Sequence, residues 1–269
     1  MELWDVYDSK GNKLNKTHVR GHKLLEDEYH LVCDCLVKHV DGSFLLMKRH
    51  PQKEVYPNYY EASAGGSALV GESPLECVKR ELQEETGIES ENFVLLDVSS
   101  NKERHSLYYS YLCIVDCNKN SIILQEGETI DYKWVSKKEF KEYITLNKLV
   151  QTQIERLKSY LETLEIGNEY RVVIDRPLGS VHPNHKNIKY TVNYGYIPGI
   201  IGGDGEEQDA YVLGVNEPLK EFKGKLIGVV IRENDNETKW IISNRDYSEE
   251  VILDKINFQE KYFKHKLFK

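Results

Sequence analysis

The sequence predicts an α+β protein built from two domains, and two features of the chain lead to this expectation. Its 269 residues exceed the size that one hydrophobic core usually organises. Residues 1–165 combine extended segments with amphipathic helical ones, whereas residues 167–269 contain short extended segments separated by turn signals. We therefore expect a first domain that mixes helices with a sheet, and a second that is a small barrel or sandwich.

Strands are expected throughout the first domain, wherever apolar residues alternate or run together between turn signals. These stretches are residues 2–8, 31–37, 44–47, 93–98, 107–115 and 132–135. Asp41-Gly42 is a typical hairpin turn between two of them. In the segment Cys33-Asp34-Cys35, strand alternation predicts core positions for the thiols and a surface position for Asp34. Zinc binding is disfavoured there because no second cysteine pair follows at a suitable spacing.

A loop followed by a helix, residues 66–88, is the segment around which the first domain is organised. Ser73 is a hydroxyl N-cap, Pro74 takes the first helical position and Glu76 completes a capping box. Gly87 supplies the terminator. Apolar residues recur between them at three- and four-residue steps, so one face of the helix is expected to be buried and the other polar.

The polar face of this helix carries Glu81, Glu84 and Glu85. Residues three and four apart on a helix are neighbours, so these carboxylates repel one another unless a cation lies among them. Their hard oxygen atoms suit Mg²⁺ or Mn²⁺, and Gly66 lets the backbone pass close to a metal or a phosphate. Arg80 is a counter-charge able to hold one glutamate by a forked hydrogen bond. A solvated acidic face is the alternative interpretation.

The spacing of the charged residues and glycines favours the metal interpretation. Its members are Gly66, Glu72, Arg80, Glu81, Glu84, Glu85 and Gly87, with an aliphatic residue after Glu81 and another after Gly87. This series resembles the Nudix box, with no position missing. The resemblance covers about residues 2–165. It implies an α/β/α sandwich with a mixed sheet, and hydrolysis of a nucleoside diphosphate linked to another group. It also implies Mg²⁺ held by the three helix glutamates and the Gly66 carbonyl.

The opening strand and the extended segment before Leu31 look most like the branch of Nudix proteins related to isopentenyl-diphosphate isomerase. That isomerase uses a cysteine before the helix together with a degenerate box. This chain has Ala64-Gly65-Gly66 at that place and an intact box. The departure favours hydrolysis, and isomerisation of an isoprenoid diphosphate stays an alternative.

Four further residues of the first domain are candidates for the site. Lys48 and Arg49 end an extended segment and are expected either to contact phosphate at the rim or to be plain surface charges. Glu61 lies in the segment that, by the resemblance, enters the box and helps to form the substrate pocket. The late acidic loop resembles one from which Nudix enzymes recruit a metal ligand or general base. We favour Glu128 over Glu126 for that role.

A helical bridge is expected between the domains, over residues 136–166. Ser136 and Glu139 form a second capping box. From residue 150 to residue 164 apolar residues step by threes and fours, which predicts one long amphipathic helix ending at Gly167. The stripe spans only about two heptads, so packing on the domain cores is favoured over a coiled coil. A homodimer seam remains the alternative.

The second domain is expected to contain short strands at residues 170–174, 196–197, 210–213, 226–231 and 240–243. Three fragments of this domain resemble the pattern of family I inorganic pyrophosphatases, which implies an OB-type barrel. They are Asp175-Arg176, residues 190–198 and residues 204–209. The family's early strand with two glutamates and a lysine has no evident counterpart here, and Glu206 stands where the family usually has aspartate.

The second resemblance assigns a role to each matching residue. Asp204 and Asp209 match metal ligands, Glu206 the residue near the attacking water, Arg176 and Tyr194 phosphate contacts, and Glu237 and Lys239 a later acidic and basic pair. Several carboxylates together can hold more than one Mg²⁺, while basic side chains neutralise pyrophosphate. The alternatives are an acidic surface loop and a non-catalytic module that binds phosphate or forms a dimer.

The composition of the chain limits the class of binding partner and the cellular compartment that we expect. The chain has 36 basic and 44 acidic residues and a net charge of −8, which argues against a general nucleic-acid or membrane-surface binder. The expected partner is a small-molecule nucleotide or diphosphate. Five cysteines at scattered spacing predict reduced thiols. With neither a signal peptide nor a long apolar run, a cytoplasmic protein is expected.

Overall fold

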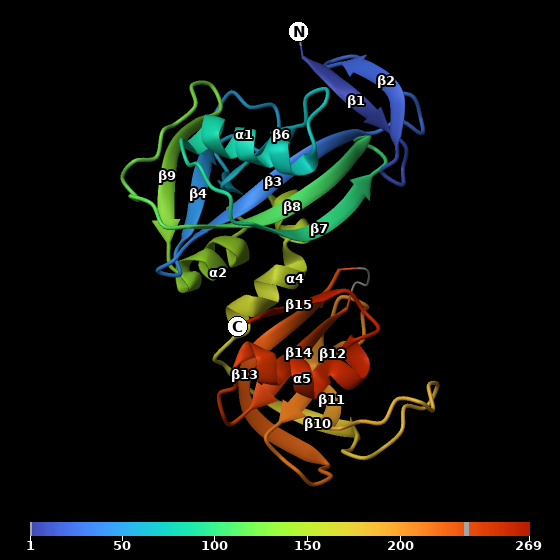
Figure 1. Cartoon of the computed structure of the whole chain (residues 1–269). Coiled ribbons are helices and arrows are strands. Elements are labelled where there is room, and N and C mark those ends of the chain that lie inside the picture. Colours follow the sequence, from blue (N-terminus) through green and yellow to red (C-terminus); the bar gives the residue numbers. More distant parts are fainter. Residues whose placement is uncertain (1, 234–236) are drawn as a thin grey trace. The chain divides into compact units, whose positions relative to one another are not determined.

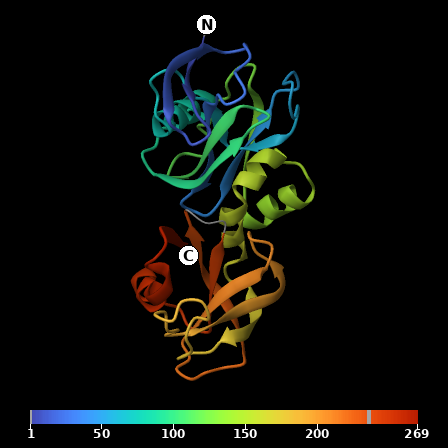
Figure 2. The ribbon, with the colours of Figure 1, turned by 90° about the vertical axis from the view of Figure 1, so that its right-hand side faces the viewer.

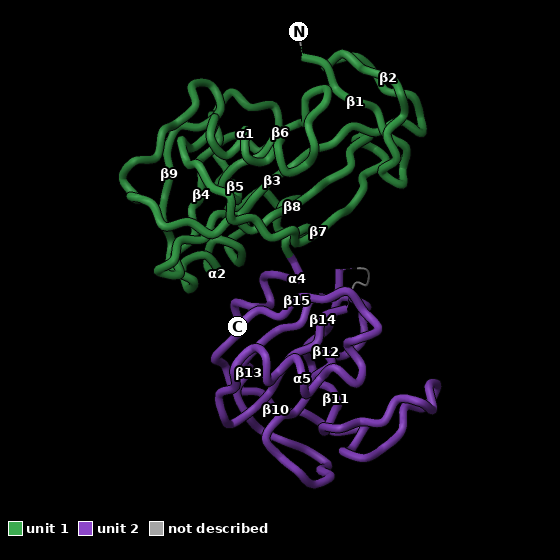
Figure 3. Tube along the Cα trace, viewed as in Figure 1, with its two compact units in different colours: residues 1–157 green, residues 158–269 purple. Residues whose placement is uncertain are grey.

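The computed structural model describes residues 2–233 and 237–269. The chain divides into two compact units, Met1–Leu157 and Lys158–Lys269 (Figure 3). The predicted α+β class is confirmed, because unit 1 contains a mixed sheet with helices and unit 2 contains a closed five-stranded barrel. The domain boundary expected at residues 165–167 stays a prediction.

Unit 1 is organised around a mixed sheet. Its strands are β1 (Leu3–Tyr7), β2 (Lys13–Val19), β3 (His30–His39), β4 (Phe44–Arg49), β5 (Tyr60–Ala62), β6 (Ala64–Ser67), β7 (Phe93–Asn101), β8 (Ser106–Val115) and β9 (Thr129–Val135). The main sheet has the order β5-β4-β3-β8-β7, with β6 paired to β3 and β9 to β4, while β1 and β2 pair separately. Strand β3 runs parallel to β8 and antiparallel to β4 and β6, which makes the sheet mixed.

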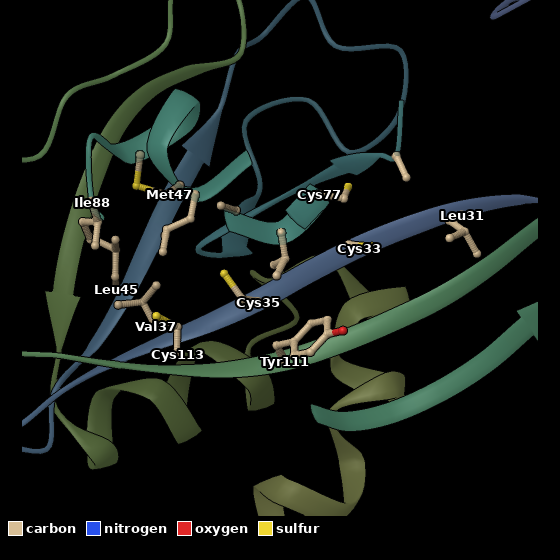
Figure 4. Packing of buried hydrophobic residues seen from close by; sticks show 14 of the residues in the cluster. Leu31, Cys33, Cys35, Val37, Leu45, Met47, Cys77, Ile88, Tyr111 and Cys113 are labelled. Carbon is tan, nitrogen blue, oxygen red and sulfur yellow. The ribbon is translucent and has the colours of Figure 1, made fainter. Parts of the chain in front are cut away.

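Helices cover both faces of this sheet (Figures 1 and 2). They are α1 (Pro74–Thr86), α2 (Lys137–Thr145) and α3 (Gln151–Arg156). On one face, Cys33 and Cys35 of β3 share a buried cluster with Cys77 of α1 (Figure 4). On the other face, Phe44 of β4 stacks on Phe140 of α2 with ring centroids 4.9 Å apart. The alternation of residues along each strand therefore places α1 on one side of the sheet and α2 on the other.

Asp34 does not take the surface position that strand alternation predicted. It is 5% exposed, because the guanidinium of Arg156 on α3 covers and pairs with its carboxylate. A buried carboxylate needs such a partner to offset its desolvation. The thiols behave as expected, since Cys33 and Cys35 are buried, and all five cysteines are free.

The single long helix expected over residues 150–164 was wrong. The segment is divided into α3, α4 (Lys158–Leu161) and the 3₁₀ turn η1 (Glu162–Glu165). The Glu162 carboxylate accepts hydrogen bonds from Thr238 Oγ1 at 2.5 Å and from Trp240 Nε1 at 2.7 Å. Contacts with the barrel thus fix the last turn in a conformation that a regular helix does not provide, and they override the local apolar period.

Unit 2 begins with the short α4 and η1 and continues as a small barrel that carries a longer helix. Its elements after η1 are β10 (Glu169–Arg176), β11 (Asn193–Ile201), β12 (Glu207–Leu213), β13 (Glu221–Arg232), β14 (Thr238–Ser243), α5 (Glu249–Glu260) and β15 (His265–Phe268). The order β10-β11-β12-β14-β13 closes through pairing of β10 with β13, and β15 extends β13. Gly195 permits the close approach of two of these strands, because a Cβ there would lie 1.9 Å from the Val173 carbonyl oxygen.

Helix α5 was not among the expected elements. Its N-cap is Ser248, whose hydroxyl accepts a hydrogen bond from Val251 N. The side chains of Ile252 and Ile256 are fully buried in the barrel core. The pair is spaced one helical turn apart, so the sequence did carry a local signal for this helix.

Candidate functional sites

Helix α1 forms as its capping signals predicted. The Ser73 hydroxyl accepts a hydrogen bond from Glu76 N, and the Glu76 carboxylate accepts one from Ser73 N at 2.8 Å. Gly87 ends the helix with a φ of 72°, in the left-handed region that favours glycine. These caps set the start and the end of the helix, and so fix the direction in which its glutamates project.

Two glycines on β6 allow the helix glutamates to reach the sheet. A Cβ on Gly66 would lie 2.2 Å from Glu81 Oε1 and 2.4 Å from Glu81 Cδ, so only glycine leaves room for this carboxylate. The neighbouring Gly65 N donates a hydrogen bond to Glu85 Oε2 at 3.0 Å. Both carboxylates are therefore held against the backbone that the sequence pattern predicted to approach a metal or a phosphate.

Arg80 connects the glutamates to the loop that precedes the helix. Its Nε and Nη2 donate to the two carboxylate oxygens of Glu72 at 2.7 and 3.0 Å. Its Nη1 donates to Glu81 at 2.8 Å and to Glu84 at 3.0 Å. The fork thus goes to Glu72, while the helix glutamates receive single hydrogen bonds. A forked pair of this kind fixes the plane of the guanidinium.

The carboxylates beside the two glycines lie in an environment that disfavours negative charge. Burial raises the pKa of Glu81, and it raises the pKa of Glu85 together with the nearby charge of Glu61. Burial also raises the pKa of Glu61, although the Arg49 guanidinium opposes this shift. A divalent cation would relieve the repulsion among these groups, and their hard oxygens are the ligands that Mg²⁺ prefers. The donor set therefore fits the expected metal.

The α1 glutamates are not arranged around one common point as metal ligands would be. Within residues 2–233 and 237–269, no group of three or more histidine, cysteine, aspartate or glutamate side chains is arranged to hold a metal ion. Instead, Arg80 Nη1 forms ion pairs with Glu81 Oε1 and Glu84 Oε2. The side chain of Glu84 is 46% exposed, so it is free to rotate away while the fork from Arg80 to Glu72 stays in place.

Three of the remaining candidates in unit 1 lie around this carboxylate cluster. Arg49 Nη1 donates to Glu61 Oε2 at 2.6 Å. Glu128 forms an ion pair with Lys53, and its carbonyl accepts a hydrogen bond from His50 N at 2.8 Å. Sequence reasoning missed Lys53, because nothing in its local pattern distinguishes it from a surface lysine.

The other two candidates, Lys48 and Glu126, are placed differently. Lys48 Nζ lies over the ring of Tyr60, 6.0 Å from its centroid, and Glu126 is exposed. The structure therefore places Arg49 and Glu61 within the cluster and Glu128 beside it through Lys53. Lys48 is directed to an aromatic ring. The preference for Glu128 over Glu126 stays a prediction, although Glu128 is the one that the ion pair holds near the site.

A buried ion pair behind Gly65 was also missed. Arg156 Nε donates to Asp34 Oδ2 at 3.1 Å and to Ser110 Oγ at 3.2 Å. A Cβ on Gly65 would lie 2.7 Å from Asp34 Cβ, so this pair supports the strand that presents Gly65 to Glu85. The one available signal was a charged residue in the middle of an apolar strand.

Comparison with known proteins identifies unit 1. The NUDIX domain model matches residues 28–157. An uncharacterized Nudix hydrolase of Listeria monocytogenes is 34% identical over 145 residues, which cover 52% of this chain and 82% of the relative. The chain belongs to the Nudix hydrolase family. A second uncharacterized Nudix hydrolase, from Listeria innocua, is 32% identical over 166 residues, covering 56% of this chain and 95% of the relative. The nucleoside triphosphatase NudI of Salmonella arizonae is 32% identical over 117 residues, or 38% of this chain and 79% of the relative.

Membership in this family supports two expectations for the chain, namely the class of bond that it cleaves and the use of a divalent metal. Nudix proteins act on phosphoric anhydride bonds of nucleotides and typically use a divalent metal. The matched residues lie within unit 1, so this match assigns no family to unit 2. Among the described residues, no helix has the length and apolar character that crossing a bilayer requires.

Unit 2 contains a cavity of about 580 Å³. Five residues predicted from the second resemblance line it, namely Arg176, Tyr194, Asp209, Glu237 and Lys239. Residues 204 and 206 are placed differently. They lie on an exposed turn, in which Asp204 Oδ1 accepts a hydrogen bond from Glu206 N at 3.0 Å, and neither is among the described residues that line the cavity.

The floor of this cavity is a network of alternating charges. Lys239 Nζ pairs with Asp209 and with Glu237, the latter at 2.5 Å. Arg232 Nη1 donates to Glu237 at 2.9 Å, and its Nε and Nη2 fork onto Glu260 at 3.0 and 2.8 Å. The two cations are 3% exposed, whereas Asp209 and Glu237 are 32% and 29% exposed. The carboxylates are therefore the part of the network that a ligand meets first.

Sequence reasoning missed the deeper part of this network. Glu260 is completely buried on α5 and also accepts a hydrogen bond from the Tyr211 hydroxyl at 2.5 Å. The sequence signal for Glu260 and Arg232 was an ionisable residue at the end of an apolar segment.

Two groups that line the cavity have shifted pKa values. Burial raises the pKa of Tyr194 well above its ordinary value, and the charge of Asp209 raises it further. Burial likewise raises the pKa of Asp175.

Proposed function

We propose that unit 1 hydrolyses a nucleoside diphosphate linked to another moiety. The carrying observation is the packing of Glu61, Glu81 and Glu85 together with their raised pKa values, beside the backbone of Gly65 and Gly66. A divalent cation would offset the repulsion among these carboxylates, and the same cation could bind a polyphosphate. The similarity to a nucleoside triphosphatase supports a nucleotide as the substrate.

The residues of the chain divide the work of this reaction. Mg²⁺ or Mn²⁺, when bound by Glu81, Glu84, Glu85 and the Gly66 carbonyl, would supply Lewis-acid polarisation of a phosphate and of a water. Arg80 keeps its fork to Glu72 and orients the helix glutamates. Arg49 and Lys53 are cations that neutralise phosphate oxygens, and Glu128 accepts the proton of the attacking water.

The experiment is a substrate screen with products resolved. Nucleoside triphosphates, nucleotide sugars, dinucleoside polyphosphates and pyrophosphate are each incubated with Mg²⁺ and with wild type or Glu84→Gln. Glu91→Gln is the matched control, because Glu91 is exposed and pairs with Lys79 outside the site. We expect hydrolysis of at least one nucleotide by the wild type and the control, and loss in Glu84→Gln. Equal turnover by all three proteins would remove the assignment.

Isomerisation of an isoprenoid diphosphate remains the alternative for unit 1. Position 64 on β6 is a buried alanine and not the cysteine which that isomerase uses before the helix. A side chain without a proton to transfer offers nothing to a double-bond shift. We expect isopentenyl diphosphate to remain unchanged with Mg²⁺ under conditions in which a nucleotide is cleaved, and its isomerisation would reverse the assignment.

We also propose that unit 2 binds pyrophosphate and hydrolyses it. The observation that favours this second function is the cavity that gathers Arg176, Tyr194, Asp209, Glu237 and Lys239 from four strands and the segment before β14. Basic side chains beside exposed carboxylates suit a diphosphate that arrives with its divalent cation. If unit 1 releases pyrophosphate from a nucleoside triphosphate, unit 2 would consume it and make the first step irreversible.

Product analysis separates this proposal from a binding or dimer-forming module. With Mg²⁺, the wild type should yield orthophosphate from pyrophosphate, and Asp209→Asn should not. Asp204→Asn tests the predicted metal role of the exposed turn, and Asp246→Asn in another exposed loop is the control. Pyrophosphate that persists with the wild type would rule out hydrolysis. An oligomer that dissociates in the variants while pyrophosphate is untouched would favour the homodimer module.

A further inference from the structure

His182 lies at the cavity of unit 2, on the loop between β10 and β11. It lines the cavity together with Arg176 and Tyr190. Its ring is nearly parallel to that of Tyr190, with an interplanar angle of 11° and a centroid separation of 6.2 Å. Its backbone N donates to the Ile188 carbonyl at 2.9 Å, which ties the residue across the loop. The imidazole is thus held at the cavity by both its backbone and its ring.

Hydrogen bonds within the loop determine which ring nitrogen carries the proton. His182 Nδ1 accepts the backbone N–H of Asn184 and that of His185, each at 3.2 Å. An acceptor nitrogen holds no hydrogen, so the neutral ring must carry its hydrogen on Nε2. Protonation of Nδ1 would turn that hydrogen toward two donors and is therefore opposed. Burial together with the nearby His185 and Arg176 also lowers the pKa of His182.

The charges of the cavity explain why a neutral donor is useful there. Among the described residues that line it, three are cationic and three are carboxylates: Arg176, Arg232 and Lys239, and Asp175, Asp209 and Glu237. Each cation has a carboxylate partner, so the fixed charges largely cancel. Recognition of an anion then depends on hydrogen-bond donors that reach the ligand without adding to the internal ion pairs.

We propose that His182 positions the ligand of this cavity as a neutral donor, with Nε2–H bonded to a phosphate oxygen of a diphosphate. The inference rests on the proposed function of unit 2. It adds a specificity-determining residue that the motif resemblance did not contain. Arg176 and Tyr190 line the same cavity and interact with His182, so they offer further hydrogen-bond donors for the same ligand.

The test compares two amides that imitate different nitrogens of histidine. Glutamine places its NH₂ near the position of Nε2, whereas asparagine places its NH₂ near that of Nδ1. We expect His182→Gln to bind pyrophosphate within about threefold of the wild type. We expect His182→Asn and His182→Ala to bind about tenfold more weakly, as for one hydrogen bond to a charged group. Titration calorimetry of the full chain without a divalent metal, so that pyrophosphate is not hydrolysed, gives the dissociation constants.

The tautomer is measured separately by long-range ¹H–¹⁵N NMR of the full chain. His182 should show an unprotonated Nδ1 and a protonated Nε2 at pH 7.5, and pyrophosphate should shift the Nε2 signal. Asp246→Asn, in an exposed loop and not among the described residues that line the cavity, is the control and should bind within about threefold of the wild type.

Each outcome separates the inference from the function on which it rests. A wild type that fails to bind pyrophosphate removes the proposed function of unit 2, and the donor role with it. A wild type that binds, with His182→Asn as tight as His182→Gln, removes the donor role alone. The same holds for an Nδ1–H tautomer, or for an equal loss in Asp246→Asn.

Discussion

Arg80 and Glu72 form a forked ion pair, with Nε to Oε1 at 2.7 Å and Nη2 to Oε2 at 3.0 Å. The pair joins α1 to the loop before it, eight residues earlier. It leaves one guanidinium nitrogen, Nη1, to be shared by Glu81 and Glu84. The direction of the helix glutamates therefore depends on a residue outside the helix.

The fork predicts that lysine cannot replace Arg80. A lysine ammonium keeps the charge but cannot span both oxygens of Glu72 while bonding Glu81. We expect Arg80→Lys to lower kcat by about 10- to 100-fold and to weaken Mg²⁺ dependence, as for residues that orient metal ligands. The control is Arg20→Lys, since Arg20 forms an exposed pair with Glu2. Steady-state kinetics with a magnesium titration measure both, and unchanged kcat in Arg80→Lys would contradict the orienting role.

Replacement of Gly66 by alanine is expected to impair the site without impairing the fold. An added Cβ would lie 2.2 Å from Glu81 Oε1, so in Gly66→Ala the carboxylate must move away. The end of a flexible side chain gives way more easily than backbone, so the fold should persist. A displacement of about 1 Å at a reacting centre costs about a hundredfold in rate. We expect kcat to fall by that order while the thermal midpoint changes by only a few degrees. A large drop in the midpoint would assign Gly66 a structural role instead.

His30 predicts a loss of stability in acid. Its ring stacks on Trp4 at 4.1 Å, and burial lowers its pKa from 6.5 to about 4. As pH falls below 6.5, the unfolded chain therefore takes up the proton before the folded one does, and unfolding is favoured. The stabilisation present at pH 7 is lost as pH falls toward 4, by up to roughly 3 kcal/mol.

Asparagine at position 30 isolates this contribution. His30 Nδ1 lies 2.9 Å from the His105 carbonyl oxygen, to which it donates, and an asparagine amide reproduces that donor without titrating. Urea unfolding of wild type and His30→Asn at pH 7 and pH 4.5 measures the difference. The gap in stability between the two pH values should be smaller in the variant. An identical gap would show that His30 is already charged in the folded protein.

The buried pair of Glu260 and Arg232 predicts a large effect on unit 2. Glu260→Gln leaves the Arg232 cation without its forked partner in a buried site, which we expect to cost about 3–5 kcal/mol. The control is Arg171→Gln, because Arg171 and Glu221 are each 61% exposed and such a pair contributes about 0–1 kcal/mol. Chemical denaturation of both variants checks the contrast. Equal small losses would contradict the packing of the barrel around Glu260.

Much of the structure around α1 was predictable because its signals are local. The caps of α1 lie within a few residues of one another, and Glu72, Arg80 and Glu81 meet across one loop and two helical turns. The α+β class followed from the change in the period of apolar residues between the two halves of the chain. Patterns that depend on neighbours in sequence survive folding when tertiary contacts agree with them.

The contacts that sequence reasoning missed join residues far apart in the chain. Asp34 and Arg156 are 122 residues apart, and Glu162 is 78 residues from Trp240. The first contact buries an aspartate expected at the surface, and the second fixes the turn that interrupts the expected long helix. In unit 2, Arg176 and Lys239 meet at one cavity while Asp204 stays on an exposed turn, a distinction that only the closed barrel makes.

The proposed hydrolysis depends on the negative charge of the α1 glutamates, and one kinetic comparison tests this dependence. The measurement is kcat with saturating Mg²⁺ for wild type and Glu85→Gln on a nucleotide that the wild type hydrolyses. Glutamine keeps the acceptor that Gly65 N uses but removes the negative charge. We predict that kcat falls by at least about a hundredfold, with an unchanged fold by circular dichroism. A Glu85→Gln protein as active as the wild type would contradict it.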